Sequence, residues 1–195
     1  MTPTVQSLWR KHLELLALWQ PRINLVSKTT LPDAWNRHTL DSAQLLPLIP
    51  PETRTLADLG SGAGFPGLVL AAALPDVAVS LYESDTRKTV FLQECIRELK
   101  LANVRIVHGR IEAAPPAGAD VVTARALADL TVLCGYAQRH LRPEGKPRLA
   151  IFLKGARWKE EVEAAKKDWS FDLAVKTSST ESAASILSLL GLSKR

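Results

Sequence analysis

A glycine-rich stretch at residues 60–64 has the composition of a ligand-binding turn. It contains three alternating glycines: Gly60, Gly62 and Gly64. A short apolar run at 55–59, whose one charged residue is Asp58, precedes it, and a helix-like run at 67–74 follows. Glycine is favoured where the backbone needs a positive φ or where a ligand must lie against the main chain. We therefore expect a strand, a turn, and a helix whose first free N–H groups face a ligand over the turn.

Two assignments of this turn imply different ligands. Gly62, Gly64 and Gly67 together match the dinucleotide-binding pattern G-x-G-x-x-G. The three alternating glycines, with Asp58 two residues ahead, instead resemble the first motif of S-adenosylmethionine-dependent methyltransferases. We favour the methyltransferase assignment because a pyrophosphate binds best at a helix N-terminus free of negative charge, whereas Asp58 can meet the amino group of S-adenosylmethionine. Glu83, at the end of the next expected strand, suits the ribose of either cofactor.

The composition is that of a globular protein with one domain and a small appendage. The chain has 195 residues, 46% of them hydrophobic, and no apolar run long enough to cross a membrane. No secretory leader is visible, so we expect a cytoplasmic protein. Cys95 and Cys134 fall on apolar faces of helical patterns and predict buried thiols rather than a metal site. The net charge of +5 is a mild indication of a polyanionic partner.

Residues 1–54 predict a helical cap without a core of its own. Apolar residues recur at helical spacing over 5–19, and Pro21 ends that helix. Pro32 opens a second helix that should run to about residue 46. The segment is too short to enclose a core, so its apolar stripe should pack on the domain that follows, which we place at 55–195.

Strand and helix patterns alternate from residue 55 onward. The expected strands are 55–59, 77–82, 104–107, 119–123 and 149–153, and the expected helices are 67–74, 86–100, 130–141 and 158–169. Two more strands, at about 173–177 and 185–190, have no helix between them and should pair antiparallel. Alternation of this kind predicts a parallel sheet with right-handed crossovers. The fold class is therefore α/β, with a Rossmann-like, mostly parallel seven-stranded sheet and a C-terminal antiparallel strand pair.

Basic residues follow the middle strands at the edge where such sheets bind their ligands, beyond the carboxyl ends of the strands. They are Arg87, Lys88, Arg110, Arg125 and Lys154. An electropositive edge disfavours a cationic substrate and favours one that carries phosphate. The alternative is that these cations pair locally, for example Arg110 with Glu112 or Arg125 with Asp129.

Fragments along nearly the whole chain are similar to those of the bacterial small-subunit ribosomal RNA methyltransferases that modify guanine N7, the glucose-inhibited division protein B family. They are Asn24-Leu25 followed by Arg37-His38 and Asp41-Ser42, DLGSGAGFPG at 58–67, ESDTRKTVFL at 83–92, GRIE at 109–112, TARAL at 123–127 and FLKG at 152–155. Their order and spacing together are specific. The final hairpin departs from the family, because Glu181-Ser182-Ala183-Ala184 stands where a basic residue is usual. The resemblance therefore implies no function for that hairpin.

The resemblance implies a class I methyltransferase fold and an enzyme that uses S-adenosylmethionine to methylate N7 of a guanine in 16S ribosomal RNA or the small ribosomal subunit. It also implies a cytoplasmic monomer that requires neither a membrane nor a metal. For the cofactor it adds Phe65 beside the turn, Ile111 and Glu112 near the adenine, and Arg125 in the same pocket. The implied cofactor-binding residues are Asp58, Gly60, Gly62, Gly64, Phe65, Glu83, Ile111, Glu112 and Arg125.

Methyl transfer to guanine N7 makes few chemical demands. N7 carries an in-plane lone pair and no proton, so the reaction needs positioning and electrostatics rather than a general base. The candidates for this work are Arg125, Arg110, Lys154 and His38. For His38 a structural hydrogen bond is the simpler interpretation, whereas Arg125 has three candidate roles. The first role of Arg125 is structural, as an ion pair with Asp129. The second is a contact with the carboxylate of the cofactor, and the third is to orient the guanine through a hydrogen bond to O6.

Other functions remain open at this point. One alternative is a methyltransferase whose substrate is an RNA other than 16S ribosomal RNA. A second is an RNA-binding module without enzymatic activity that keeps an unused cofactor site. A nicotinamide-dependent oxidoreductase shares the fold, although the chain lacks the Tyr-x-x-x-Lys pattern of its short-chain form. The chain also lacks the Asn/Asp-Pro-Pro-aromatic motif that serves methylation of exocyclic amines.

Overall fold

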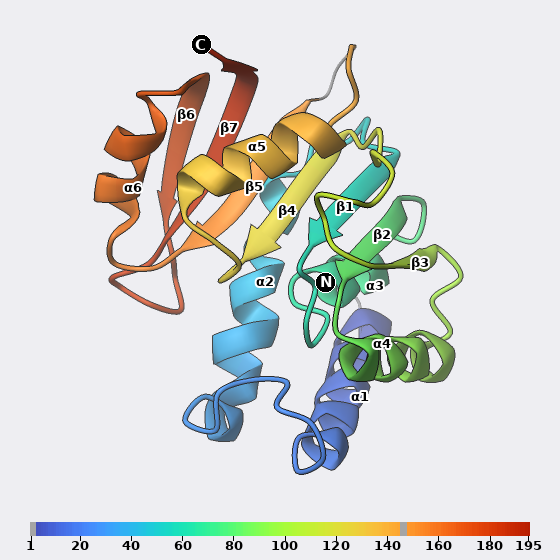
Figure 1. The fold of residues 1–195 in the computed structure, drawn as a ribbon. Coiled ribbons are helices and arrows are strands. Elements are labelled where there is room, and N and C mark those ends of the chain that lie inside the picture. The colour runs from blue at the N-terminus through green and yellow to red at the C-terminus, as the bar shows by residue number, and fades with distance from the viewer. Residues whose placement is uncertain (1–2, 145–147) are drawn as a thin grey trace.

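The computed structural model describes residues 3–144 and 148–195, and a seven-stranded sheet runs through its centre (Figure 1). The strand order is β3-β2-β1-β4-β5-β7-β6. β1 to β5 pair in parallel, whereas β7 is antiparallel to both β5 and β6. The strands are β1 (Thr55–Leu59), β2 (Ala78–Glu83), β3 (Val104–His108), β4 (Val121–Arg125), β5 (Leu149–Lys154), β6 (Trp169–Thr177) and β7 (Ser185–Lys194). The predicted fold class, including the C-terminal antiparallel pair, is confirmed.

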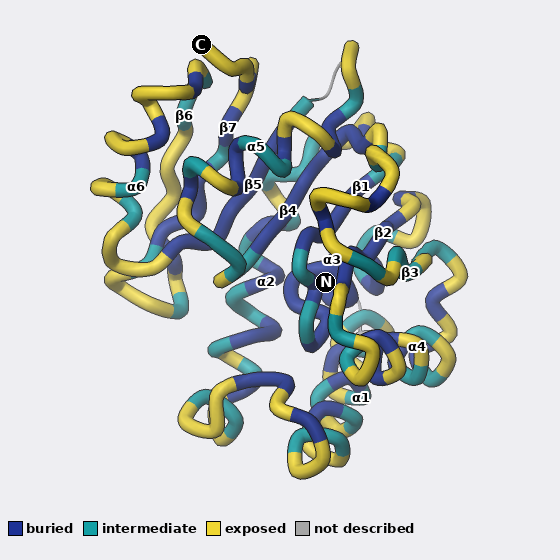
Figure 2. Tube along the Cα trace, in the orientation of Figure 1, coloured by how far each residue is buried: buried dark blue, intermediate teal, exposed yellow. Residues whose placement is uncertain are grey.

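Helices cover both faces of the sheet (Figure 1). One hydrophobic core joins α1 (Pro3–Trp19), α3 (Gly67–Ala73) and α4 (Thr86–Leu99) to one face, and a second joins α5 (Leu130–His140) and α6 (Trp158–Ala165) to the other. The central strands β1, β4 and β5 are almost entirely buried between these layers (Figure 2). A strand buried on both faces is a nearly continuous apolar run, which explains why these segments were recognisable in the sequence.

The helix α1 packs its apolar stripe on the sheet domain, as predicted. Trp9 is 1% exposed, and its indole Nε1 donates a hydrogen bond to the carbonyl oxygen of Val69 at 3.0 Å. Trp19 meets the ring of Phe91 edge-on, with 5.8 Å between the ring centroids. The cap and the sheet therefore share one hydrophobic core.

The second part of the cap is helical but is not the single regular helix that we expected. It consists of η1 (Leu31–Asp33), the π-helical turn η2 (Trp35–Leu40), α2 (Asp41–Ala43) and η3 (Leu46–Leu48). The N–H of Asp41 bonds to the carbonyl oxygen of Asn36, five residues back, so the turn holds one residue more than an α-helix. A π turn of this kind is rare and often marks a functional site.

Two boundaries near the C-terminus also differ from the prediction. The helix expected over 158–169 ends at Ala165, and β6 already begins at Trp169. Val162, Ala165 and Trp169 are all buried and have helical spacing, but Trp169 pairs with Lys194 in the sheet. Spacing alone cannot separate a helix from a helix followed directly by a strand.

None of the described helices is long and apolar enough to cross a membrane. Cys95 and Cys134 are buried as predicted, and burial raises the pKa of Cys134 to about 12.

Candidate functional site

Two adjoining cavities lie at the carboxyl edge of the parallel strands, where the strand order reverses between β1 and β4. The first, here called the turn cavity, has a volume of about 360 Å³ and is lined by Gly60, Gly62, Glu83, Ser84, Lys88, Tyr82, 109–112, 126–128 and Tyr136. The second, the cap cavity, has a volume of about 430 Å³ and lies between the cap, Arg125, Lys154 and the turn of the β6–β7 hairpin. Ala126 lines both cavities. A crevice at such a reversal point is where open α/β sheets bind ligands.

The structure brings five of the nine predicted cofactor-binding residues into the turn cavity: Gly60, Gly62, Glu83, Ile111 and Glu112. Arg110, a candidate for catalysis, lines the same cavity. Gly60, Gly62 and Gly64 have φ values of +67°, +56° and +85°. A Cβ atom on Gly64 would lie 2.4 Å from Leu68 Cδ1, whereas the nearest atom to one on Gly62 is the Gly60 carbonyl oxygen at 3.8 Å. The backbone at Gly62 therefore leaves an open cradle, as the predicted ligand-binding turn requires.

Glu83 holds this turn in place from the end of β2. Its carboxylate accepts hydrogen bonds from the N–H groups of Gly62, Ser84 and Asp85, each at 2.8 Å. Two of these bonds go to Oε1 and one goes to Oε2. A carboxylate has about four acceptor sites, so Oε2 keeps room for one further donor from a ligand.

Asp58 lies beneath the turn and lines neither cavity. It is 0% exposed; Oδ1 accepts a hydrogen bond from Thr123 Oγ1 at 2.8 Å, and Oδ2 accepts one from the N–H of Gly67 at 3.2 Å. Burial raises its pKa to about 6. Asp58 thus ties β1 to β4 and to the start of α3, and its contact with the amino group of a cofactor stays a prediction.

Arg125 lies in the cap cavity, and the pairing with Asp129 that we considered is not found. Its Nη1 donates to the carbonyl oxygen of Arg37 at 3.1 Å and to His38 Nδ1 at 2.9 Å, and it lies 3.6 Å from Asp41 Oδ2. The guanidinium also stacks over the ring of Phe65, 5.3 Å from its centroid. Arg125 is therefore held by the cap rather than by Asp129 at the start of α5. Ala126, with a φ of +50°, begins the loop that separates it from Asp129.

Phe65 and Gly64 do not line the turn cavity. Phe65 is 3% exposed and packs against the rings of His12 and His38, at centroid distances of 4.6 Å and 5.2 Å. It therefore contacts the site through Arg125 and His38, and its proposed place beside the cofactor stays a prediction.

His38 is neutral and oriented by two hydrogen bonds. A guanidinium can only donate, so His38 Nδ1 must accept from Arg125, and the ring proton is on Nε2. Nε2 then donates to Thr30 Oγ1 at 2.9 Å. Burial, together with the positive charges of Arg125 and Arg37, lowers the pKa of His38 to about 4. These contacts support the structural interpretation of His38, since both ring nitrogens are occupied.

The other two basic candidates differ from each other. Lys154 is 9% exposed; its Nζ donates to the carbonyl oxygen of Ala128 at 2.7 Å and pairs with Glu161 Oε2 at 2.5 Å. Arg110 is exposed, and no salt bridge to it is found among residues 3–144 and 148–195. The pairing of Arg110 with Glu112 is not formed, and Glu112 accepts a hydrogen bond from the hydroxyl of Tyr136 instead. This bond, with the nearby charge of Arg110, lowers the pKa of Glu112.

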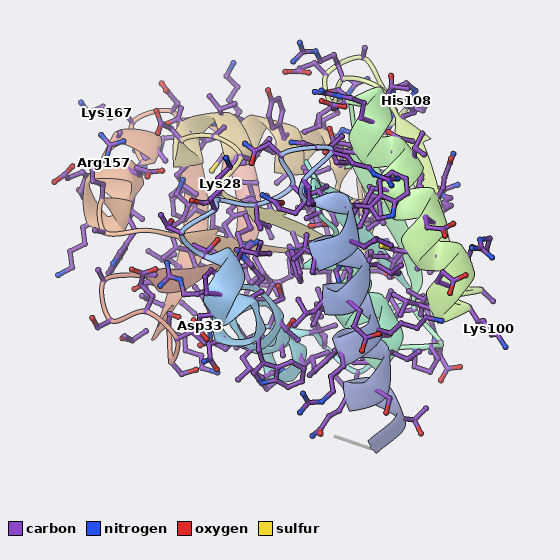
Figure 3. The ribbon with its side chains drawn as sticks, turned by 90° about the horizontal axis from the view of Figure 1, so that it is seen from below. Lys28, Asp33, Lys100, His108, Arg157 and Lys167 are labelled. Carbon is purple, nitrogen blue, oxygen red and sulfur yellow. The ribbon has the colours of Figure 1, made fainter. Side chains whose placement is uncertain are left out.

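The cap cavity contains residues to which sequence reasoning gave no role. Asp41 was noted only within the family resemblance, and the β6–β7 turn was given no function. In the structure this turn docks on the cap: Thr180 Oγ1 donates to Asp41 Oδ1 at 2.8 Å, the N–H of Ser179 donates to Gln44 Oε1 at 2.6 Å, and Arg37 pairs with Glu181 at 2.6 Å. Seen from below, α1 and α2 lie between α4 and α6 (Figure 3).

Two buried histidines with strongly lowered pKa values, His12 and His38, make the stability of the protein depend on pH. The buried His140, whose pKa burial also lowers, acts in the same direction. His12 is 1% exposed, its Nε2 donates to the Ala63 carbonyl oxygen at 2.8 Å, and burial lowers its pKa to about 4, as for His38. Between pH 6.5 and 4 the unfolded histidines bind protons that the folded ones do not. The free energy of unfolding should therefore fall as the pH is lowered through this range, by about 3 kcal/mol for each histidine.

Asp58 acts in the opposite sense, because its raised pKa lets the folded state bind a proton first; one carboxyl offsets part of the effect of two histidines. Urea unfolding at pH 7, 5.5 and 4.5 measures the net change. His12→Gln keeps a hydrogen-bond donor but does not titrate, so it should flatten the profile. A free energy of unfolding that stays constant or rises on acidification would contradict this prediction.

Comparison with known proteins gives consistent matches over most of the chain. The family model described as GidB, rRNA small subunit methyltransferase G, matches residues 5–189. The chain is 48% identical to the ribosomal RNA small subunit methyltransferase G of Paramagnetospirillum magneticum, over 95% of this chain and 88% of that protein. It is 44% identical to the protein of the same name from Ruegeria sp. strain TM1040, over 93% of this chain and 88% of that protein.

Solved structures with low sequence identity share the fold. One is TYW2 from M. jannaschii in complex with AdoMet, with a TM-score of 0.61 and 15% identity, covering 90% of this chain and 80% of that one. Another is a SAM-dependent methyltransferase from Aquifex aeolicus, with a TM-score of 0.60 and 14% identity, covering 82% of this chain and 92% of that one.

Proposed function

The chain belongs to the rRNA small subunit methyltransferase G family, and we propose that it transfers a methyl group from S-adenosylmethionine to N7 of a guanine in 16S ribosomal RNA. One observation carries the proposal beyond the family name. The glycine turn, held by Glu83, opens on a cavity that shares Ala126 with a second cavity large enough for a nucleobase. This arrangement suits a reaction in which a methyl donor in the turn cavity and an acceptor base in the cap cavity meet beside Ala126.

The turn cavity fits S-adenosylmethionine, which supplies an electrophilic methyl group when bound. The open cradle at Gly62 lets a ligand approach the main chain, and the remaining acceptor site on Glu83 Oε2 suits a ribose hydroxyl. Ile111 and Glu112 line the same cavity and would flank the adenine. A dinucleotide fits less well, because the carboxylate of Asp58 already occupies the N–H of Gly67 where a pyrophosphate would bind.

The acceptor chemistry is supported by what the side chains in the cap cavity do. Guanine N7 has no proton to lose, so the reaction needs no general base, and His38 has both ring nitrogens engaged. The two cysteines of the chain are buried, which disfavours a covalent route through a thiolate. What remains is positioning and electrostatics, which rigid donors such as Arg125 provide.

We further propose how the chain is organised for its substrate. Residues 1–54 act as a helical cap on a methyltransferase domain of residues 55–195, and the protein works as a monomer in the cytoplasm without a metal. Exposed basic side chains, such as Arg110 in the turn cavity and Lys28 (labelled in Figure 3), would contact phosphates of the RNA.

Mapping of modified nucleotides in 16S ribosomal RNA tests the function directly. RNA from cells with the gene should carry a 7-methylguanine that RNA from cells without it lacks, and the purified protein should restore it with S-adenosylmethionine. Calorimetry with S-adenosylhomocysteine and with NAD tests the cofactor separately. Heat with NAD alone, or identical modification maps from the two strains, would show the proposal to be wrong.

A further inference from the structure

Two groups with free hydrogen-bonding capacity lie side by side in the cap cavity. Arg125 makes its hydrogen bonds through Nη1 alone; none is found for Nη2 or Nε among the described residues. Asp41 uses Oδ1 to accept from Thr180 and Gln44, while its Oδ2 meets only Arg125 Nη1, at 3.6 Å. The side chains of Arg125 and Asp41 are 18% and 15% exposed, so they face the cavity rather than open water. The cavity thus offers a donor next to an acceptor.

A donor beside an acceptor is the pattern that guanine requires. Guanine carries the acceptor O6 next to the donor N1–H, whereas adenine carries an amino donor at position 6 next to the acceptor N1. A base that is taken out of its stack for chemistry is recognised through this edge. Adenine would set its amine against the Arg125 guanidinium and its N1 lone pair against the Asp41 carboxylate.

We propose that Asp41 and Arg125 together select guanine in the cap cavity, with Arg125 donating to O6 and Asp41 accepting from N1–H. This inference rests on the proposed function and names the residues that read the acceptor base. In guanine, N7 lies on the opposite side of O6 from N1. A base held in this way turns N7 away from Asp41, and Ala126, which directly follows Arg125, leads into the turn cavity.

The other charged side chains of the cavity are less suited to this role. Glu181 is paired with Arg37 at 2.6 Å, and Lys154 is paired with Glu161 at 2.5 Å. What distinguishes Asp41 is its place beside Arg125: its Oδ2 lies 3.6 Å from Arg125 Nη1 and has no closer partner among the described residues. A base without N1–H would bind less tightly, because Asp41 Oδ2 would then lose its contact with water without gaining a hydrogen bond.

Binding of nucleoside monophosphates to the full chain saturated with S-adenosylhomocysteine tests the proposal. The wild type should bind guanosine monophosphate at least about tenfold more tightly than adenosine monophosphate, since one good base contact discriminates by this much. Inosine monophosphate, which keeps O6 and N1–H, should bind like guanosine monophosphate, and 1-methylguanosine monophosphate should bind poorly. In Asp41→Asn the guanine preference should fall below about threefold.

Two further variants separate recognition from structure. Asp33→Asn removes an exposed carboxylate of the same cap that does not line the cavity, and should keep the wild-type preference. Thr180→Val removes the hydroxyl that holds Asp41 Oδ1 but leaves Oδ2 free. If Thr180→Val and Asp41→Asn lose the preference equally, Asp41 only docks the hairpin and the proposal is wrong.

The inference also fails if the wild type does not distinguish guanosine from adenosine monophosphate, even where 16S ribosomal RNA is found methylated at guanine N7. The proposed function fails on different results, namely no binding of S-adenosylhomocysteine or no change in the modification map.

Discussion

Arg125→Ala is expected to lower kcat/KM for methylation of small-subunit particles by about 10- to 100-fold while the protein stays folded. The substitution removes a donor that contacts His38 and the carbonyl oxygen of Arg37 in the cap. The same donor lines the cap cavity, where we propose that the acceptor base binds. Loss of one charge-assisted hydrogen bond costs about 1.5–3 kcal/mol, which is one to two decades in rate. Transfer of labelled methyl from S-adenosylmethionine to particles from cells without the gene measures the effect.

Two controls identify what Arg125 does. Arg125→Lys should restore activity only in part, because an ammonium cannot reproduce the planar fork that contacts two groups at once. Arg97→Ala removes an exposed arginine of α4 and should leave the rate unchanged. The affinity of Arg125→Ala for S-adenosylhomocysteine decides whether Arg125 contacts the carboxylate of the cofactor or orients the guanine. A contact with the carboxylate would be lost with Arg125, so the affinity would fall. A variant that melts much earlier yet methylates normally where folded would show that Arg125 is structural.

Glu83→Ala is expected to weaken binding of S-adenosylhomocysteine by about 100-fold or more. The carboxylate accepts three backbone N–H groups around the glycine turn, and the change leaves all three without that acceptor. Hydrogen bonds to a charged group contribute about 1.5–3 kcal/mol each, so the turn should lose its shape as well as the contact that we propose between Glu83 and the ribose. Calorimetry measures the affinity, and circular dichroism checks that the fold persists.

Glu112 provides a matched comparison in the same cavity. It is exposed, and its carboxylate accepts from the hydroxyl of Tyr136 and from its own backbone N–H, not from the glycine turn. Glu112→Ala should therefore lower the affinity for S-adenosylhomocysteine far less than Glu83→Ala does. Equal effects of the two substitutions would mean that Glu83 does not anchor the turn.

Much of the fold is determined locally and was predictable from the sequence. β1 and β5 are mostly apolar because both of their faces are buried, with Asp58 and Lys154 as the charged exceptions. The alternation of strands and helices leaves few topologies open. Asp85 caps α4 by accepting the N–H groups of Arg87 and Lys88, which is a short-range signal. The glycine turn was equally predictable, because backbone positions with positive φ values favour glycine.

The contacts that assemble the site are not local, and only the tertiary structure decided them. Arg125 was expected to choose between Asp129, the cofactor and the base, yet its protein partners lie in the cap, 87 and 88 residues away in the chain. Asp58 could not be recognised as buried from its place in the motif, because β4 and α3 enclose it.

The docking of the β6–β7 turn on Asp41 spans 139 residues and involves short polar side chains that carry no periodic signal. Sequence patterns report which face of an element is buried and how its ends are capped, since these depend on neighbours a few residues away. Which side chains meet across the cap cavity depends on how the cap and the hairpin pack on the finished sheet.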